Sequence, residues 1–178
     1  LAETLKAYGV RLQLKWPNDL FYRDGKLGGI LTEYVEEHLL VGVGVNVGNV
    51  VPDGAAALRG WNLEDVHGAV LAGIRRGLDA WLDAPERLPE RFERFDAQAG
   101  ATVHVARGRA HLRGVAHGID GDGCLLLERV DATGHPVATA AAGTGASGAR
   151  GPDGRLRAAL QPVCSGSVEL PEGRLPRR

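Results

Sequence analysis

Four polar residues near the start of the sequence are the side chains best suited to chemistry. Lys15, Asn18 and Asp19 follow one another closely, and Lys26 comes next. A cation, an amide and a carboxylate are the minimum set that can hold a nucleotide phosphate together with a magnesium ion. Only three of the 21 basic residues are lysines, the third being Lys6. This scarcity indicates that Lys15 and Lys26 serve chemistry that needs a compact ammonium group.

Glycines in two neighbouring predicted strands provide a surface on which a ligand could lie. Gly28 and Gly29 fall in one of these strands, and Gly42 and Gly44 fall in the next. Without side chains at these positions, a flat ligand can reach the backbone N–H and C=O groups directly. The second pair does not form a dinucleotide fingerprint, because the third glycine would be due at Val47 and no helix follows.

Each of these features also has an ordinary structural explanation. Pro-Asn-Asp is a frequent turn sequence, a lysine beside a hairpin turn is often simply solvated, and glycines in strands often mark β-bulges. Among the six histidines, His104, His111 and His117 fall on neighbouring predicted strands, but no carboxylate or cysteine pattern accompanies them. A histidine metal site is therefore not expected.

The segment that carries the lysines and glycines is predicted to form a sheet covered by helices. A helix that ends near Gly9 is followed by apolar residues in alternation, which predict a three-stranded antiparallel meander. Its strands are expected at 10–22, with an interruption at Pro17, at 27–35 and at 39–47. Two amphipathic helices are then expected, at 62–81 and 86–98, the first capped by Asn62.

From residue 101 the sequence changes to short alternating strands, which are typical of a small β-barrel. Residues from about 131 to 162 are rich in Ala, Gly, Thr and Arg without periodicity, and they are interpreted as a flexible insertion. Cys124 and Cys164 show no metal-ligand spacing, and we expect both to be buried small side chains without a chemical role. Free cysteines and the lack of a signal peptide favour a reducing, cytoplasmic location.

Composition limits the remaining classes of function. The chain has 178 residues, of which 44% are hydrophobic, enough to build a folded core. Its formal net charge of -1 argues against a dedicated nucleic-acid or membrane-surface binding protein, and there is no apolar run of about 18 residues. Because the sequence has no Met and opens in a predicted helix, we expect further sequence to precede Leu1.

Three motifs together resemble the biotin protein ligases, also called biotin–[acetyl-CoA-carboxylase] ligases. They are Lys15-Trp16-Pro17-Asn18-Asp19, Lys26-x-x-Gly29-Ile30-Leu31 and Gly42-x-Gly44-x-Asn46. The resemblance covers roughly residues 1–100, and residues 118–127 look like the family's C-terminal SH3-like module. It implies an α+β fold of the class II synthetase-like type. An antiparallel or mixed sheet covered by helices would occupy residues 1–99, and a small SH3-like β-barrel residues 100–178.

The resemblance also implies roles for single residues. Lys26 would lie at the reacting centre as the catalytic residue. Biotin contacts would fall on Lys26, Gly28, Gly29, Ile30, Leu31, Gly42 and Gly44. ATP contacts would fall on Lys15, Asn18, Val45 and Asn46, and a magnesium contact on Asp19. Gly48 departs from the family pattern, because Asn is frequent at that position.

The implied reaction activates biotin with ATP as biotinyl-5′-AMP and transfers it to a lysine of a biotin carboxyl carrier protein. Biotin, ATP and Mg²⁺ are thus expected, with a homodimer as one expected assembly and without a nucleic-acid or membrane partner. The family's Arg- and Gly-rich biotin loop would precede Leu1, so we expect the 178-residue chain alone to be impaired. Two alternatives stay open, a non-catalytic fragment that binds carrier protein and a lipoate or octanoate transferase of the same fold.

Overall fold

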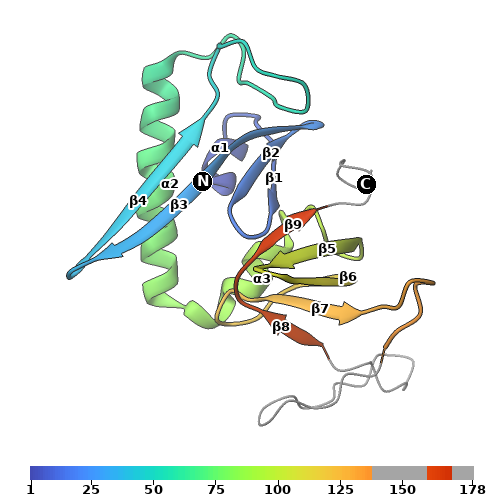
Figure 1. Cartoon of the computed structure of the whole chain (residues 1–178). Coiled ribbons are helices and arrows are strands. Elements are labelled where there is room, and N and C mark those ends of the chain that lie inside the picture. Colours follow the sequence, from blue (N-terminus) through green and yellow to red (C-terminus); the bar gives the residue numbers. More distant parts are fainter. Residues whose placement is uncertain (138–159, 170–178) are drawn as a thin grey trace. The chain divides into compact units, whose positions relative to one another are not determined.

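The computed structural model describes residues 1–137 and 160–169 of the chain (Figure 1). The chain divides into two compact units, Leu1–Ala97 and Gln98–Arg178. Each unit has its own antiparallel sheet, and the helices belong to the first unit. The expected α+β class is therefore confirmed.

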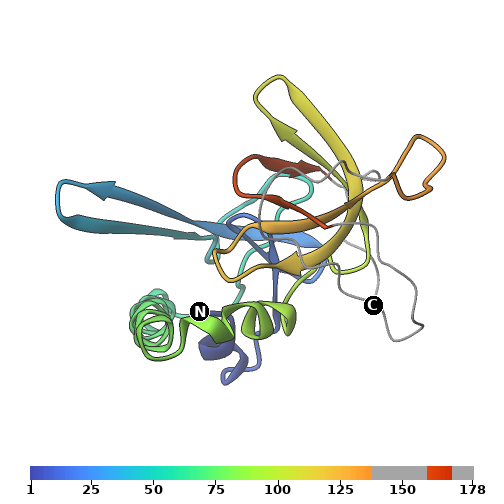
Figure 2. The same ribbon diagram turned by 90° about the horizontal axis from the view of Figure 1, so that it is seen from below.

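The first unit contains four strands and four helical segments. The strands are β1 (Leu12–Lys15), β2 (Asp19–Tyr22), β3 (Gly25–Val35) and β4 (His38–Val45), paired in the order β1-β2-β3-β4. The helices are α1 (Ala2–Lys6), α2 (Leu63–Asp83), the 3-10 turn η1 (Pro85–Arg87) and α3 (Leu88–Glu93). Because β3 and β4 are much longer than β1 and β2, they extend past them as a two-stranded ribbon (Figures 1 and 2).

The sheet has four strands where the sequence pattern predicts three. Pro17 does not interrupt one strand, because the chain reverses between Lys15 and Asp19, and β1 pairs antiparallel with β2. This reversal makes Lys15 and Asp19 direct cross-strand partners. The prediction was wrong here because a proline within a run of alternating apolar residues fits two structures, a strand that is interrupted and continues, or a chain that reverses its direction. The pairing of β2 with β3 decides between them.

One face of this sheet packs on the helices. Leu12, Leu20 and Leu27 are buried together with Val66 and Ala69 of α2. The Asn62 side chain accepts a hydrogen bond of 2.8 Å from the Glu64 N–H, which confirms the predicted cap of α2. The core therefore lies between the sheet and α2, and the other sheet face carries the polar residues.

The second predicted helix is shorter than expected. It consists of η1 and α3 and ends at Glu93. The Leu14 N–H donates to Phe95 O at 2.7 Å, and the Ala97 N–H donates to Leu14 O at 2.8 Å. Residues 95–97 therefore pair beside β1, and these backbone bonds take the place of further helical turns.

The described part of the second unit is a five-stranded antiparallel sheet. Its strands are β5 (Thr102–Arg107), β6 (Ala110–Ile119), β7 (Leu125–Arg129), β8 (Gln161–Val163) and β9 (Ser167–Glu169). They pair in the order β8-β7-β6-β5-β9, so that β8 and β9 form the two edges. Within residues 98–137 and 160–169 the sheet is thus open, and the expected closed barrel is not found.

Two expectations for this unit are corrected. Cys124 and Cys164 are joined by a disulfide, so they are not free side chains as predicted. The expected insertion at 131–162 has regular structure at both ends, since Asp131 caps a turn by accepting from the N–H groups of Thr133 and His135, and β8 begins at Gln161. The central residues of that insertion, 138–159, lie outside the described residues.

In the parts of the chain at 1–137 and 160–169, the helices are too short or too polar to cross a membrane.

Candidate functional site

Four residues lie side by side in a row on neighbouring strands of the first sheet, on the face that does not pack against α2. This face is called the open face below. Lys15 of β1 pairs with Asp19 of β2, Asp19 pairs with Gly29 of β3, and Gly29 pairs with Gly44 of β4. Residues directly opposite each other in an antiparallel pair project to the same face. The sheet order of Figure 1 therefore brings a cation, a carboxylate and two glycines onto one surface.

Asp19 holds the two lysines of this face. Its Oδ1 lies 2.5 Å from Lys26 Nζ, and its Oδ2 lies 3.4 Å from Lys15 Nζ. The side chains of Lys15 and Asp19 are 15% and 17% exposed, whereas that of Lys26 is 51% exposed. Such partly exposed ion pairs stabilise a fold by only about 0–1 kcal/mol. Their main effect is positional, because they fix two ammonium groups around one carboxylate and leave a net charge of +1.

The magnesium role implied for Asp19 does not fit this arrangement. Both of its carboxylate oxygens face a lysine ammonium. Mg²⁺ needs oxygen ligands that are free to coordinate it, usually one or two carboxylates plus substrate phosphates. We therefore derive no step through a magnesium ion held by these residues.

The glycines keep the centre of the open face flat. A Cβ atom at position 44 would have no heavy atom within 4 Å outside its chain neighbours, and one at position 42 would meet only Leu31 O, at 3.8 Å. At position 29 a Cβ atom would lie 3.2 Å from Asn18 O and 3.7 Å from Asp19 Oδ1. Gly42 pairs with Leu31, whose side chain is 70% exposed. The surface beside the lysines therefore combines exposed backbone with an apolar margin.

Three of the residues expected at the site lie on the opposite side of the sheet. Ile30 and Val45 pack against the hydrophobic core. Gly28 allows β3 and β4 to approach each other closely, because a Cβ atom at this position would collide with the backbone oxygen of Gly44. At these three positions a ligand on the open face could contact only the backbone. Side-chain contacts to such a ligand would come from the residues that project from the open face.

Lys26 is held at its backbone by a loop to which the sequence pattern assigned no role. The Lys26 N–H donates to Gly54 O at 2.9 Å, and the Ala56 N–H donates to Lys26 O at 2.9 Å. The Asn46 side chain donates from Nδ2 to Ala56 O at 3.1 Å. Gly25 permits this approach, since a Cβ atom there would lie 2.7 Å from the carbonyl carbon of Ala55. No sequence periodicity could reveal this contact.

The residues expected to bind ATP do not form one group. Lys15 lies on the open face, while Val45 faces the core and the Asn46 amide is bonded to the loop. Asn18 lies in the turn between β1 and β2, and its backbone oxygen accepts from the Ile30 N–H at 2.9 Å. Of these four residues, Lys15 is thus the one whose side chain the sheet places beside Asp19.

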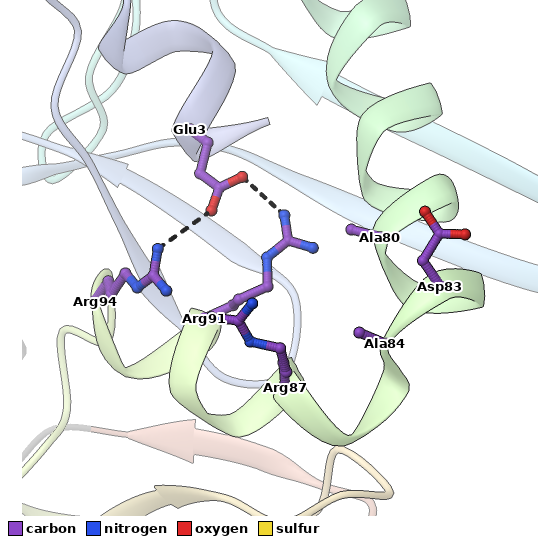
Figure 3. A pocket seen from close by; sticks show the side chains of 7 residues that line it. All are labelled: Glu3, Ala80, Asp83, Ala84, Arg87, Arg91 and Arg94. Atoms are coloured by element: carbon purple, nitrogen blue, oxygen red, sulfur yellow. Dashed lines mark hydrogen bonds and ion pairs between the residues drawn. The ribbon is translucent and has the colours of Figure 1, made fainter.

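The first unit also contains a hollow of about 360 Å³, and its lining residues Glu3, Arg87, Arg91 and Arg94 take part in ion pairs (Figure 3). Glu3 accepts from Arg91 at 2.7 Å and lies 4.0 Å from Arg94. Glu90 pairs with Arg94 at 2.9 Å and with Arg87 at 3.4 Å. The hydrogen bond from Arg91 lowers the pKa of Glu3. These pairs join α1 to α3, which is a structural role. The hollow is lined by Glu3, Ala80, Asp83, Ala84, Arg87, Arg91 and Arg94.

Comparisons with known proteins connect the open face with one family. The model of the Biotin/lipoate A/B protein ligase family matches residues 1–48, which include the whole row from Lys15 to Gly44. The bifunctional ligase/repressor BirA of Escherichia coli (strain K12) is 30% identical over 146 residues, covering 72% of this chain and 46% of BirA. The biotin–[acetyl-CoA-carboxylase] ligase of Mycobacterium tuberculosis is 32% identical over 124 residues, covering 65% of this chain and 47% of that ligase.

The chain is thus similar to the Biotin/lipoate A/B protein ligase family over residues 1–48 and to biotin ligases over about half of their length.

Solved structures of a biotin protein ligase are similar in fold to this chain. The apo biotin protein ligase from Aquifex aeolicus has a TM-score of 0.70 at 21% identity, covering 95% of this chain and 70% of that one. The same ligase in complex with biotin and ATP has a TM-score of 0.68 at 21% identity, covering 94% and 66%. The chain spans about half the length of the curated relatives it matches. The resemblance to biotin protein ligases drawn from the three motifs is therefore confirmed.

Proposed function

We propose that the open face of the first unit binds biotin and the adenylate formed from biotin and ATP. The observation that carries the proposal is the row Lys15, Asp19, Gly29 and Gly44, with Lys26 held beside it. A flat ring system can lie on the glycine backbone, and a carboxylate and a phosphate can then lie beside the two ammonium groups. The names of the relatives, which include biotin ligases, support this choice of ligand.

In the first step, the biotin carboxylate attacks the α-phosphorus of ATP. A carbon–oxygen–phosphorus anhydride forms, and pyrophosphate leaves with the bonding electron pair. The step brings two anions together, so positive groups that are already in place lower its barrier. We assign this role to Lys26, which is half exposed and can reach the reacting atoms, with Lys15 as the second ammonium.

Asp19 acts in this proposal as a positioning residue. It contacts both lysines and keeps their ammonium groups on the ligand side of the sheet. The backbone bonds from the loop to Lys26 fix the other end of that side chain. A flexible lysine that is held at both ends loses less conformational freedom when it binds the adenylate.

In the second step, a lysine amine of a carrier protein attacks the acyl carbon of the adenylate and AMP leaves. The amine must first lose a proton, because a free lysine has a pKa of about 10.4. We propose a biotin carboxyl carrier protein as the acceptor, and the sheet of the second unit as the SH3-like module expected from the sequence.

Calorimetric titration of the 178-residue chain with biotinyl-5′-AMP tests the proposal. We expect the wild-type chain to bind and Lys26→Ala to weaken binding at least tenfold, or about 1.4 kcal/mol. Lys6→Ala is the matched control, since Lys6 is an exposed lysine of α1 in the same unit. It should bind as the wild type does.

Three results would count against the proposal. The first is no binding of biotinyl-5′-AMP by the folded wild-type chain. The second is equal weakening by Lys26→Ala and Lys6→Ala, which would show that Lys26 contributes only general charge. The third is tighter binding of the lipoyl adenylate, which would favour lipoate transfer in place of biotin transfer.

A further inference from the structure

The second unit contains a disulfide between Cys124 and Cys164. Cys124 lies directly before β7 and Cys164 directly after β8. The ladder pairs Leu125 with Val163, so the next positions outward, 124 and 164, face each other across the two strands. Their Cα atoms are 4.1 Å apart, and their side chains are bonded. The bond therefore extends the β7–β8 ladder by one covalent pair.

Few backbone hydrogen bonds hold β8, the strand that this disulfide joins to β7. β8 has three residues, and within the described part of the chain it pairs with β7 through Leu125, Leu126 and Leu127. Its central residue is Pro162, which has no N–H to donate to the ladder. Yet Val163 is only 1% exposed. A short edge strand thus contributes a core residue, and the disulfide joins the end of this strand covalently to the start of β7.

The two cysteines of this disulfide differ in their exposure to solvent. Cys124 is buried, with 6% of its surface exposed, whereas Cys164 is exposed. An attacking thiolate needs access to the sulfur on which the new bond forms. Access therefore favours attack at Cys164, and Cys124 is the sulfur that leaves.

We propose that Cys124–Cys164 is a reversible thiol–disulfide site, opened by low-molecular-mass thiols at Cys164, and that its opening releases β8 from β7. A thiolate RS⁻ attacks Sγ of Cys164, an R–S–S–Cys164 bond forms, and the S–S bond breaks. The electron pair goes to Sγ of Cys124, which takes a proton from water. A second thiolate attacks the R sulfur, so that RSSR leaves and Cys164 becomes a thiol. Two RSH molecules are oxidised as the protein disulfide is reduced.

The test uses the whole chain in glutathione buffers of increasing reducing strength. Thiols are trapped by alkylation, and the modified residue is located by peptide mass spectrometry. We expect no alkylation before reductant is added, and then a mixed disulfide on Cys164. Hydrogen exchange of β7 and β8 peptides should become at least tenfold faster after reduction, while that of β3 and β4 peptides stays unchanged.

The variant Cys164→Ser provides the control, because its exchange should be fast from the start and insensitive to glutathione. The wild-type titration keeps the test valid if this variant folds poorly. Alkylation of both cysteines in the untreated folded protein would overturn the proposal, as would a mixed disulfide confined to Cys124. Unchanged exchange in β7 and β8 after full reduction would also overturn it.

Discussion

Replacing glycines of the ribbon one at a time separates folding from ligand binding. Gly44→Ala adds a methyl group on the open face, where no heavy atom outside the chain neighbours lies within 4 Å. Gly28→Ala adds the same group where it collides with the backbone oxygen of Gly44. The two positions belong to neighbouring paired strands, so the substitutions are chemically and locally matched.

The structure predicts opposite effects for the two variants. Gly44→Ala should leave stability unchanged or raise it by about 0.4–1 kcal/mol, since alanine has less freedom in the unfolded chain. Its methyl group should displace a ligand that lies on the backbone, with a loss of about 1–3 kcal/mol, or roughly 5- to 150-fold in Kd. Gly28→Ala should destabilise the first unit by about 1–3 kcal/mol, because β3 and β4 must separate to admit the group.

Two measurements distinguish these effects. Urea unfolding followed by tryptophan fluorescence reports on the first unit, since Trp16, Trp61 and Trp81 all belong to it. Calorimetric titration with biotinyl-5′-AMP measures ligand binding at the open face. Gly68→Ala is the matched control, because a Cβ atom there also meets nothing within 4 Å but lies on α2. Normal binding by Gly44→Ala, or lower stability of Gly44→Ala than of Gly28→Ala, would refute the reasoning.

Three further substitutions test the supporting contacts. Asp19→Asn should weaken binding of biotinyl-5′-AMP at least tenfold with a smaller change in the midpoint of unfolding, measured by calorimetric titration and urea titration; equal binding would contradict the positioning role. Asn46→Ala removes the donor to a loop carbonyl and should cost about 1–3 kcal/mol in urea unfolding, whereas an unchanged midpoint would contradict the contact. Glu3→Gln should lower the Tm at neutral pH. Because Arg91 lowers the pKa of Glu3, the wild-type advantage is present above the pKa of an unfolded glutamate and is lost as the pH falls through the folded pKa; a Tm difference that is constant with pH would contradict this.

Local sequence patterns were sufficient for much of the first unit. Alternating apolar residues predicted β3 and β4, and the apolar spacing after Asn62 predicted α2 and its cap. The lysines could be singled out because the chain has only three of them, and Gly29 because glycine is unusual in the interior of a strand. In each case the informative residues are neighbours in sequence, so short-range physics is enough.

Contacts between distant segments could not be predicted in this way. The reversal at Pro17 depends on whether β2 finds a partner in β3, and the support of Lys26 depends on a loop near Ala56. The disulfide requires Cys124 and Cys164, 40 residues apart, to become neighbours in the β7–β8 ladder. Propensity and periodicity contain no information about such pairings.

The central claim is that ligand lies on the glycine face beside the lysines. Backbone amide NMR of the 178-residue chain during titration with biotinyl-5′-AMP tests it most directly. The account predicts that the largest shifts occur at Gly29, Gly42 and Gly44, together with Asp19 and Lys26. Shifts that instead gather around the arginine-lined hollow of Figure 3, or no saturable shifts at all, would contradict it.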